Sequence, residues 1–292
     1  MRFPESVAHL VQHNYSLAPR LWLGIGGPAR YYAEPTNRAE LIELVRAASE
    51  QGVQVRVLGG GSNLLARESG VDGLVISLAS AALSELVVDG SRLTAGAGAM
   101  LSRTVTHAVG VGLAGLEHLL GIPGTVGGAL VSNAGAGGRD IGSVTAAVEL
   151  LGLDGQVQSI TAEEAQFSHR RSSLDGQIIL SATFQLENLD LESLTKRMQK
   201  LWIIRNAAQP KDQSRIAMPF VDPDGATAQR LISDIGLAGV REGGAALNSE
   251  YPNFLIAHDE ATSSDCLKLI ERVREQVLLQ TGIDLQSNLQ IW

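Results

Sequence analysis

Clusters of glycine are the feature that most restricts how this chain can fold. The chain has 32 glycines, and the clusters are concentrated in its first half, among them GGGSN at 59–63 and GIPGTVGGA at 121–129. Fixing a glycine costs backbone entropy, so a fold that keeps many of them needs positive φ or close approach of two backbone segments. The clusters therefore predict a backbone that wraps tightly around another group.

The first cluster places Gly59, Gly60 and Gly61 directly after a predicted strand and before Ser62 and Asn63. Successive glycine N–H groups can form a concavity that holds a phosphate, and the two polar side chains add donors. The cluster is not a Rossmann fingerprint, because the G-x-G-x-x-G spacing is missing and the next segment is predicted to be a strand. Taken alone, it is compatible with a structural turn or a ligand loop.

The second glycine-rich stretch, GIPGTVGGALVSNAGA at 121–136, leaves the same two alternatives open. Backbone donors between Gly121 and Gly128 can line a flat ligand, or the glycines can serve only a tight turn. The two clusters in combination favour a ligand site.

The rest of the pattern predicts an α+β protein. Apolar spacing predicts helices at 37–51, 101–112, 191–209, 226–239 and 263–282, and β-rich segments at 53–65, 73–78, 83–99, 144–160 and 176–186. Asp89-Gly90 and Asp154-Gly155 are expected to be hairpin turns. Because helix–strand and strand–strand connections both occur, a mixed architecture is favoured over a doubly wound sheet.

Charge and composition exclude several classes of partner. The net charge is −8 and no block of Lys and Arg stands out, so we expect neither nucleic acid nor an anionic membrane as a partner. No stretch of eighteen apolar residues and no leader sequence is found, which predicts a soluble, cytoplasmic protein. The single Cys266 lies in a predicted helix, where we expect it to be a packed residue. The six histidines lack a ligand spacing, so no metal is expected.

The two glycine clusters in this order, with LGIGGPARYYAEP at 23–35, resemble the UDP-N-acetylenolpyruvoylglucosamine reductases. These flavoenzymes complete UDP-N-acetylmuramic acid in peptidoglycan synthesis. The likeness runs over essentially the whole chain and includes RNAAQP at 205–210, the stretch from AQRLISD to NFLIA at 228–257, and GIDLQSNLQIW at 282–292.

The resemblance implies an FAD-binding fold of the vanillyl-alcohol oxidase and p-cresol methylhydroxylase type. Two α+β FAD-binding subdomains, 1–80 and 81–190, would be followed by a C-terminal α+β substrate domain at 191–292. The resemblance also implies NADPH as electron donor and a UDP-amino-sugar enolpyruvyl ether as substrate. The positions that it assigns to FAD are Gly59, Gly60, Gly61, Ser62, Asn63, Gly121, Ile122, Pro123, Gly124, Thr125, Gly127, Gly128, Asn133, Ala134 and Gly135.

The catalytic positions implied by the resemblance are only partly filled. Arg170 matches an arginine that holds the substrate carboxylate, but His169 stands where tyrosine is usual. Met218 replaces the proton-donating serine, and Asn288 replaces a C-terminal glutamate. A thioether cannot donate a proton and an amide cannot ionise, so the usual proton relay is absent. His169 adjoins Arg170, and Asp222 lies shortly after Met218. Either of these two side chains can carry a proton.

Other departures also fall on the expected substrate side and spare the expected flavin residues: Leu21, Trp22, Val221, Asn248 and Tyr251. The favoured hypothesis is an FAD-dependent reductase that uses Arg170 with a replacement donor. Two alternatives stay open. One is a catalytically impaired flavin-binding paralogue with a binding or regulatory role, and the other is a flavin oxidoreductase with a different substrate.

Overall fold

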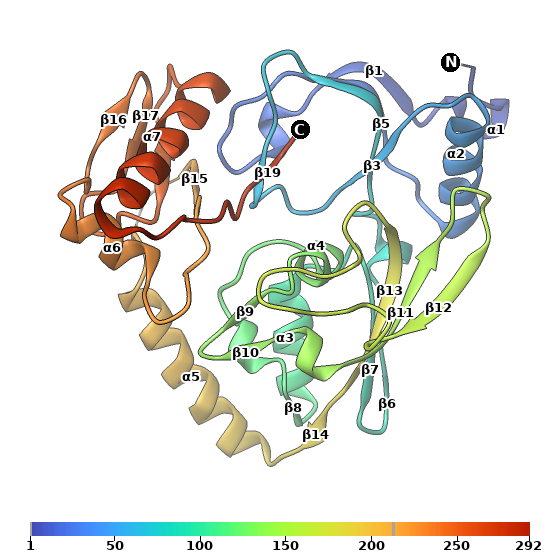
Figure 1. Cartoon of the computed structure of the whole chain (residues 1–292). Coiled ribbons are helices and arrows are strands. Elements are labelled where there is room, and N and C mark those ends of the chain that lie inside the picture. The colour runs from blue at the N-terminus through green and yellow to red at the C-terminus, as the bar shows by residue number, and fades with distance from the viewer. Residues whose placement is uncertain (1, 212–213) are drawn as a thin grey trace. The chain divides into compact units, whose positions relative to one another are not determined.

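The computed structural model describes residues 2–211 and 214–292, which form two compact units built from separated stretches of sequence (Figure 1). Unit 1 comprises Met1–Asn14, Arg30–Gly60 and Asp72–Arg205, and unit 2 comprises Tyr15–Ala29, Gly61–Val71 and Asn206–Trp292. Both contain helices and strands, which confirms the predicted α+β class. The division at about 80 and 190 stays a prediction.

The first sheet of unit 1 has the strand order β1-β2-β5-β3. Its strands are β1 (Val11–Ser16), β2 (Pro28–Ala33), β3 (Val55–Leu58) and β5 (Val71–Ser77), and β3 runs parallel to β5. The predicted helix at 37–51 is α2 (Arg38–Glu50), which begins where Asn37 accepts a hydrogen bond from the Glu40 N–H. Leu41 and Leu44 of α2 belong to the same buried core as Leu74 and Ile76 of β5, so the apolar face of the helix covers this sheet.

The second sheet of unit 1 is fully antiparallel, in the order β12-β11-β13-β7-β6. Its strands are β6 (Leu86–Asp89), β7 (Arg92–Gly96), β11 (Thr145–Leu151), β12 (Val157–Thr161) and β13 (Ile178–Gln185). Both predicted hairpins are confirmed, and Gly90 and Gly155 adopt the positive φ that their turns require. Helix α4 (Val126–Val131) packs against β13 and β7, and α3 (Leu101–Gly110) packs against α4. The second glycine cluster thus leads into a short helix that the sequence did not predict.

The shorter elements of unit 1 are α1 (Glu5–Ala8), η2 (Ala81–Leu83), β8 (Leu113–Ala114), η3 (Glu117–Leu119), β9 (Gly135–Ala136), β10 (Arg139–Asp140), η4 (Gly142–Val144) and β14 (Glu187–Asn188). Among them, η3 lies between α3 and the β9–β10 pair.

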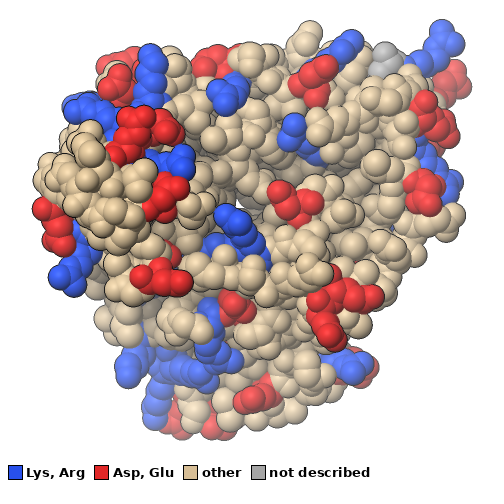
Figure 2. All heavy atoms as spheres, in the orientation of Figure 1, with Lys and Arg blue, Asp and Glu red and all other residues tan. Residues whose placement is uncertain are grey.

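Helix α5 (Leu191–Ala207) follows β14 and buries little of its surface. Leu194 is its one fully buried residue among those described, whereas Trp202, Ile203 and Ile204 are all more than half exposed. Figure 2 shows basic side chains gathered over the lower part of this helix, which carries Lys196, Arg197 and Lys200. The net negative charge of the chain is therefore not evenly spread.

Unit 2 is built on an antiparallel sheet with the order β15-β18-β17-β16. Its elements are η1 (Ala18–Arg20), β4 (Leu64–Leu65), β15 (Ile216–Ala217), α6 (Ala228–Asp234), β16 (Arg241–Glu242), β17 (Ala245–Leu247), β18 (Leu255–Ala257), α7 (Ser263–Thr281) and β19 (Gln290–Ile291). Helix α7 packs against β16 and β17, and β19 pairs in parallel with β4.

The ends of the helices in unit 2 follow their local sequence. Helix α7 starts with a capping box between Thr262 and Asp265 and stops at Gly282, whose φ is positive. Helix α6 is shorter than predicted because Gly236 and Gly239 both adopt positive φ beyond its last turn. Cys266 is fully buried on α7, as predicted, and burial raises the pKa of its thiol to about 12.

Candidate functional site

The two glycine clusters meet in unit 1. A Cβ atom added to Gly60 would lie 2.6 Å from the Cα of Gly124, and one added to Gly59 would lie 2.8 Å from Oγ1 of Thr125. Both distances are shorter than real Cβ atoms show. At Gly60 the opposing atom is also backbone, which cannot rotate away as a side chain can. The structure thus brings together two loops that lie more than sixty residues apart in sequence, and only glycine fits at their contact.

Part of the second cluster is tied to the segment between β7 and α3. The N–H groups of Val126 and Gly127 donate to the carbonyl oxygens of Ala99 and Ala97, both at 2.9 Å, and the N–H of Ile122 donates to Leu119. These three donors are used within the protein, so fewer backbone groups face a ligand than the glycine content alone suggests. Close packing against other parts of the protein is an observed reason for glycine here, since a Cβ atom on Gly127 would lie 3.1 Å from the Cβ of Ala97.

Asn133 joins the expected flavin-side segment to the loop that carries the candidate arginine. Its side chain is buried, and Nδ2 donates to Asp140 at 3.0 Å and to the carbonyl oxygen of Ser168 at 2.8 Å. Its Oδ1 accepts from the Gly142 N–H at 3.0 Å. All of these bonds are internal, which indicates that Asn133 shapes the site through the backbone around it.

His169 and Arg170 form the tip of a tight turn that starts at Ser168. The turn is closed by hydrogen bonds in both directions between the backbones of Ser168 and Arg171, at 2.9 and 3.1 Å. Arg170 has a φ of 58°, a left-handed conformation that side chains other than glycine rarely adopt. Strain of this kind is concentrated at functional sites. Ser172, just after the turn, donates its hydroxyl to the carbonyl oxygen of Val131 at 2.9 Å and anchors the loop.

Arg205 is a charged residue at this site that the sequence motifs do not single out. Its Nε donates to the carbonyl oxygen of Leu120 at 3.1 Å, directly before the second glycine cluster. Burial, and after it the positive charge of Arg170, lower the pKa of Arg205. This residue opens the segment RNAAQP at 205–210, but only the folded chain shows that it contacts the loop at Leu120.

Two more buried ionisable residues lie close by on η3. Glu117 is fully buried and pairs with Arg197 at 3.0 Å, and its second oxygen accepts from the Gly115 N–H at 2.6 Å. His118 is also buried, and neither of its ring nitrogens makes a well-aligned hydrogen bond to a described residue. Burial, followed by the positive charge of Arg139, lowers the pKa of His118.

In unit 2, the loop that starts at Met218 runs antiparallel to the C-terminal segment around Asn288. The Asn288 N–H donates to the carbonyl oxygen of Pro219 at 2.8 Å, and its side-chain amide donates to the carbonyl oxygen of Met218 at 3.1 Å. Asn63 completes the cluster, because its Nδ2 donates to the Asn288 carbonyl oxygen at 2.6 Å. The structure thus places Met218 and Asn288, the two substituted catalytic positions, side by side.

Asp222 has a structural role within the same loop. Its Oδ1 accepts a hydrogen bond of 2.8 Å from the N–H of Ala228, the first residue of α6. The carboxylate is exposed, so it helps to start the helix while it still faces water.

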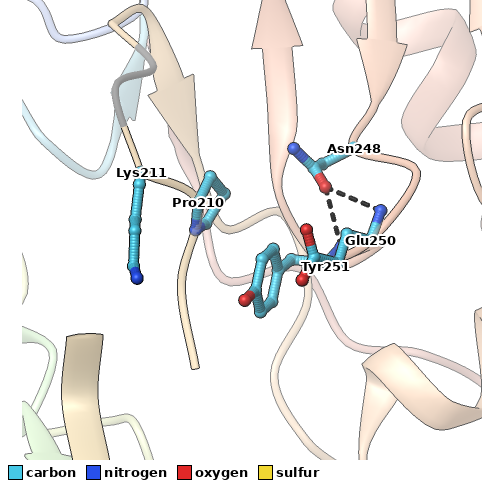
Figure 3. Close-up of a pocket in the computed structure, with 5 residues that line it drawn as sticks. All are labelled: Pro210, Lys211, Asn248, Glu250 and Tyr251. Carbon is cyan, nitrogen blue, oxygen red and sulfur yellow. Dashed lines mark hydrogen bonds between the residues drawn. The ribbon is translucent and has the colours of Figure 1, made fainter. Parts of the chain in front are cut away.

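A polar pocket of 280 Å³ in unit 2 is lined by Pro210, Lys211, Asn248, Glu250 and Tyr251 (Figure 3). Oδ1 of Asn248 accepts from the N–H groups of Glu250 and Tyr251, at 2.8 and 2.7 Å, and so fixes the turn that carries the tyrosine. In Figure 3 the Tyr251 ring lies beside Pro210, with Lys211 extended on the other side of that proline. A hydrogen bond with Glu250 is the main cause that raises the pKa of Tyr251.

Within residues 2–211 and 214–292, no helix is both long and apolar enough to cross a membrane. No group of three or more His, Cys, Asp or Glu side chains in that part of the chain is placed to hold a metal ion.

Comparison with known proteins covers both halves of the chain. Residues 29–161 match the family described as "FAD binding domain", and residues 209–292 match "UDP-N-acetylenolpyruvoylglucosamine reductase, C-terminal domain". A UDP-N-acetylenolpyruvoylglucosamine reductase of Rhodopirellula baltica is 55% identical over 290 residues, which cover 99% of this chain and 95% of that protein. One of Heliobacterium modesticaldum is 37% identical and covers 91% and 86% of the two chains.

Solved structures agree. The crystal structure of the UDP-N-acetylenolpyruvylglucosamine reductase of Thermus caldophilus matches with a TM-score of 0.84 and 35% identity, over 97% of this chain and 98% of that one. A solvent-stable cholesterol oxidase matches with a TM-score of 0.51 and 18% identity, over 64% and 39%, which shows a shared fold only. These matches confirm the predicted FAD-binding fold and FAD as the cofactor.

Proposed function

The chain belongs to the UDP-N-acetylenolpyruvoylglucosamine reductase family, and we propose that it reduces the UDP-linked enolpyruvyl sugar with NADPH as electron donor. The proposed place of action is the cytoplasm. The observation that carries the proposal is the contact of Gly60 with Gly124, because it packs together the backbones of the two glycine clusters that the family resemblance assigns to FAD. Bound FAD would accept a hydride from NADPH and pass it to the enolpyruvyl group.

Arg170 is the proposed anchor for the carboxylate of the substrate. A guanidinium group can hold a carboxylate with two parallel hydrogen bonds, which fixes the orientation of the enolpyruvyl group. The left-handed backbone at the tip of the turn supports this role, since strained backbone conformations cluster at functional sites. Holding the substrate in this orientation lowers the entropic part of the activation barrier.

The proton that completes the reduction needs a donor other than residue 218. We propose His169 and Asp222 as the two replacement candidates. His169 is exposed in the same turn as Arg170, which supports it, whereas the Asp222 carboxylate already accepts the Ala228 N–H. Replacing each separately, as His169→Gln and Asp222→Asn, tests them. The donor variant should slow oxidation of the reduced flavin by the UDP-sugar and leave flavin reduction by NADPH unchanged.

The polar pocket around Tyr251 is the proposed binding place for the nucleotide part of the substrate. The Lys211 ammonium group can pair with a diphosphate, and the Tyr251 ring offers a face for a base. Lys211→Ala is expected to raise the KM for the UDP-sugar without a matching change in kcat. Glu250→Gln, which removes a negative charge from the same pocket, is expected to lower that KM.

The central experiment starts with the visible spectrum of the purified protein, followed by NADPH oxidation with and without the enolpyruvyl UDP-sugar. The proposal expects a bound flavin and NADPH oxidation that is accelerated by the sugar. A flavin spectrum without acceleration would reject the reductase and favour the impaired paralogue. Faster flavin reduction by another donor, in the absence of a response to the sugar, would favour a different substrate.

A further inference from the structure

Arg205 has a hydrogen-bonding group that the protein itself does not use. Its Nη2 is buried and has no hydrogen-bond partner among the described residues. Leaving a buried donor of a charged group unsatisfied costs free energy, and proteins rarely do so without a ligand or a functional reason. The guanidinium group therefore has the chemistry of an anion-binding site.

The charges around Arg205 strengthen this assignment. No carboxylate in the described part of the chain pairs with it, and Arg170 is near enough to oppose its positive charge. Two like charges in a partly buried place repel each other, and an anion between or beside them would relieve the repulsion. Perturbation of this kind is typical of functional sites.

The position of Arg205 indicates which anion it meets. Its Nε is fixed to the Leu120 carbonyl oxygen, and a Cβ atom on Gly121 would lie 3.1 Å from its Cγ. The side chain therefore lies along the start of the second glycine cluster and not on the turn that presents Arg170. The family resemblance assigns this glycine cluster to FAD, which favours the flavin over the substrate carboxylate as the partner.

We propose that Arg205 is a positioning residue that balances the negative charge formed on the flavin ring when FAD is reduced. The inference rests on the proposed function for the reduction itself. A hydride from NADPH brings two electrons and one proton, so a neutral flavin gains one negative charge and NADP⁺ leaves. Arg205 stays protonated throughout and gives up no proton. A fixed cation beside the ring favours the reduced form and raises the midpoint potential.

The test is the flavin midpoint potential of the full-length, FAD-loaded protein, measured by redox titration for the wild type and three variants. In Arg205→Gln, the preference of the protein for reduced over oxidised flavin is expected to fall at least tenfold. A tenfold fall lowers the midpoint potential by about 30 mV. Arg205→Lys keeps the charge without the planar fork and should fall in between. Arg92→Gln removes an exposed arginine of β7 and should leave the potential unchanged.

An unchanged potential in Arg205→Gln would overturn the inference, and a raised KM for the UDP-sugar in that variant would identify the substrate as the partner instead. If Arg205→Gln retains too little FAD, its affinities for oxidised and reduced FAD are measured separately. Equal weakening of both would show a purely structural role and also overturn the inference. The potential is measured without NADPH or sugar, so loss of the proposed reductase activity and loss of this effect are separate results.

Discussion

The side-chain amide of Asn288 donates one hydrogen bond to the carbonyl oxygen of Met218, 3.1 Å away, and another to Oδ1 of Asn63 at 3.3 Å. The family resemblance implies glutamate at position 288 and serine at position 218. The substitutions therefore form a connected pair, because the amide at 288 supplies donors that a carboxylate cannot.

Restoring only the glutamate is expected to weaken the fold. In Asn288→Glu, an ionised carboxylate would face two acceptor oxygens and lose both hydrogen bonds, at a cost of about 1 kcal/mol in the free energy of unfolding. Urea unfolding measures this change. Asn288→Gln keeps the amide and serves as the control. Equal stability of the glutamate variant and the wild type would contradict the interpretation.

Restoring the serine is expected to help the chemistry. A positioned general acid contributes about 10²–10⁴-fold in rate, so Met218→Ser should speed oxidation of the reduced flavin by the UDP-sugar about tenfold or more. Anaerobic stopped-flow absorbance measures that step. Met218→Ala removes a similar volume without adding a hydroxyl group. If both variants react equally fast, the gain comes from space and not from proton donation.

The contact between the glycine clusters predicts a steric effect. Gly60→Ala would force a Cβ atom against the Cα of Gly124 and should cost about 1–3 kcal/mol of stability, with loss of bound FAD. The flavin content per protein and thermal unfolding measure the two effects. Gly110 has open space around its Cα at the end of α3, so Gly110→Ala should keep its FAD and be as stable or slightly more so. Full FAD content in Gly60→Ala would show that the loops part easily.

The buried side chain of His118 is expected to make the free energy of unfolding depend on pH. Because burial lowers its pKa in the folded state, the unfolded chain takes up a proton first as the pH falls below about 6.5. Stability from this residue is therefore fully present above that pH and declines below it, by at most about 1.4 kcal/mol per pH unit. His118→Phe should flatten the unfolding free energy between pH 7 and 5 relative to the wild type. Parallel curves for the two proteins would refute this.

The sequence predicted the elements that are determined locally. Helix α7 carries its own capping box and terminal glycine, and the two hairpins carry Asp-Gly turns, so neighbouring residues alone specify them. Apolar spacing was sufficient for α2 as well. Helix α4 was missed, since it contains two glycines and its six residues are held by packing against β13 and β7.

The order of the two glycine motifs predicted which residues form the site. It did not predict the contacts that these residues make. The glycine pattern indicated that Gly59 and Gly60 needed space, but only the folded chain shows that Gly124 and Thr125 occupy it. Arg205 carried no local signal, because its significance depends on a carbonyl group 85 residues earlier and on the charge of Arg170. Likewise, nothing in the sequence near Asn133 shows that its amide would hold Ser168.

The bond between Asn63 and the Asn288 carbonyl oxygen spans 225 residues. In a chain made from its N-terminus, the loop with Ser62 and Asn63 is synthesised long before the partner strand β19 that flanks it. That side of the loop can take its final form only late in translation. We therefore expect nascent chains that stop short of β19 to fold much of unit 1 while they bind FAD weakly.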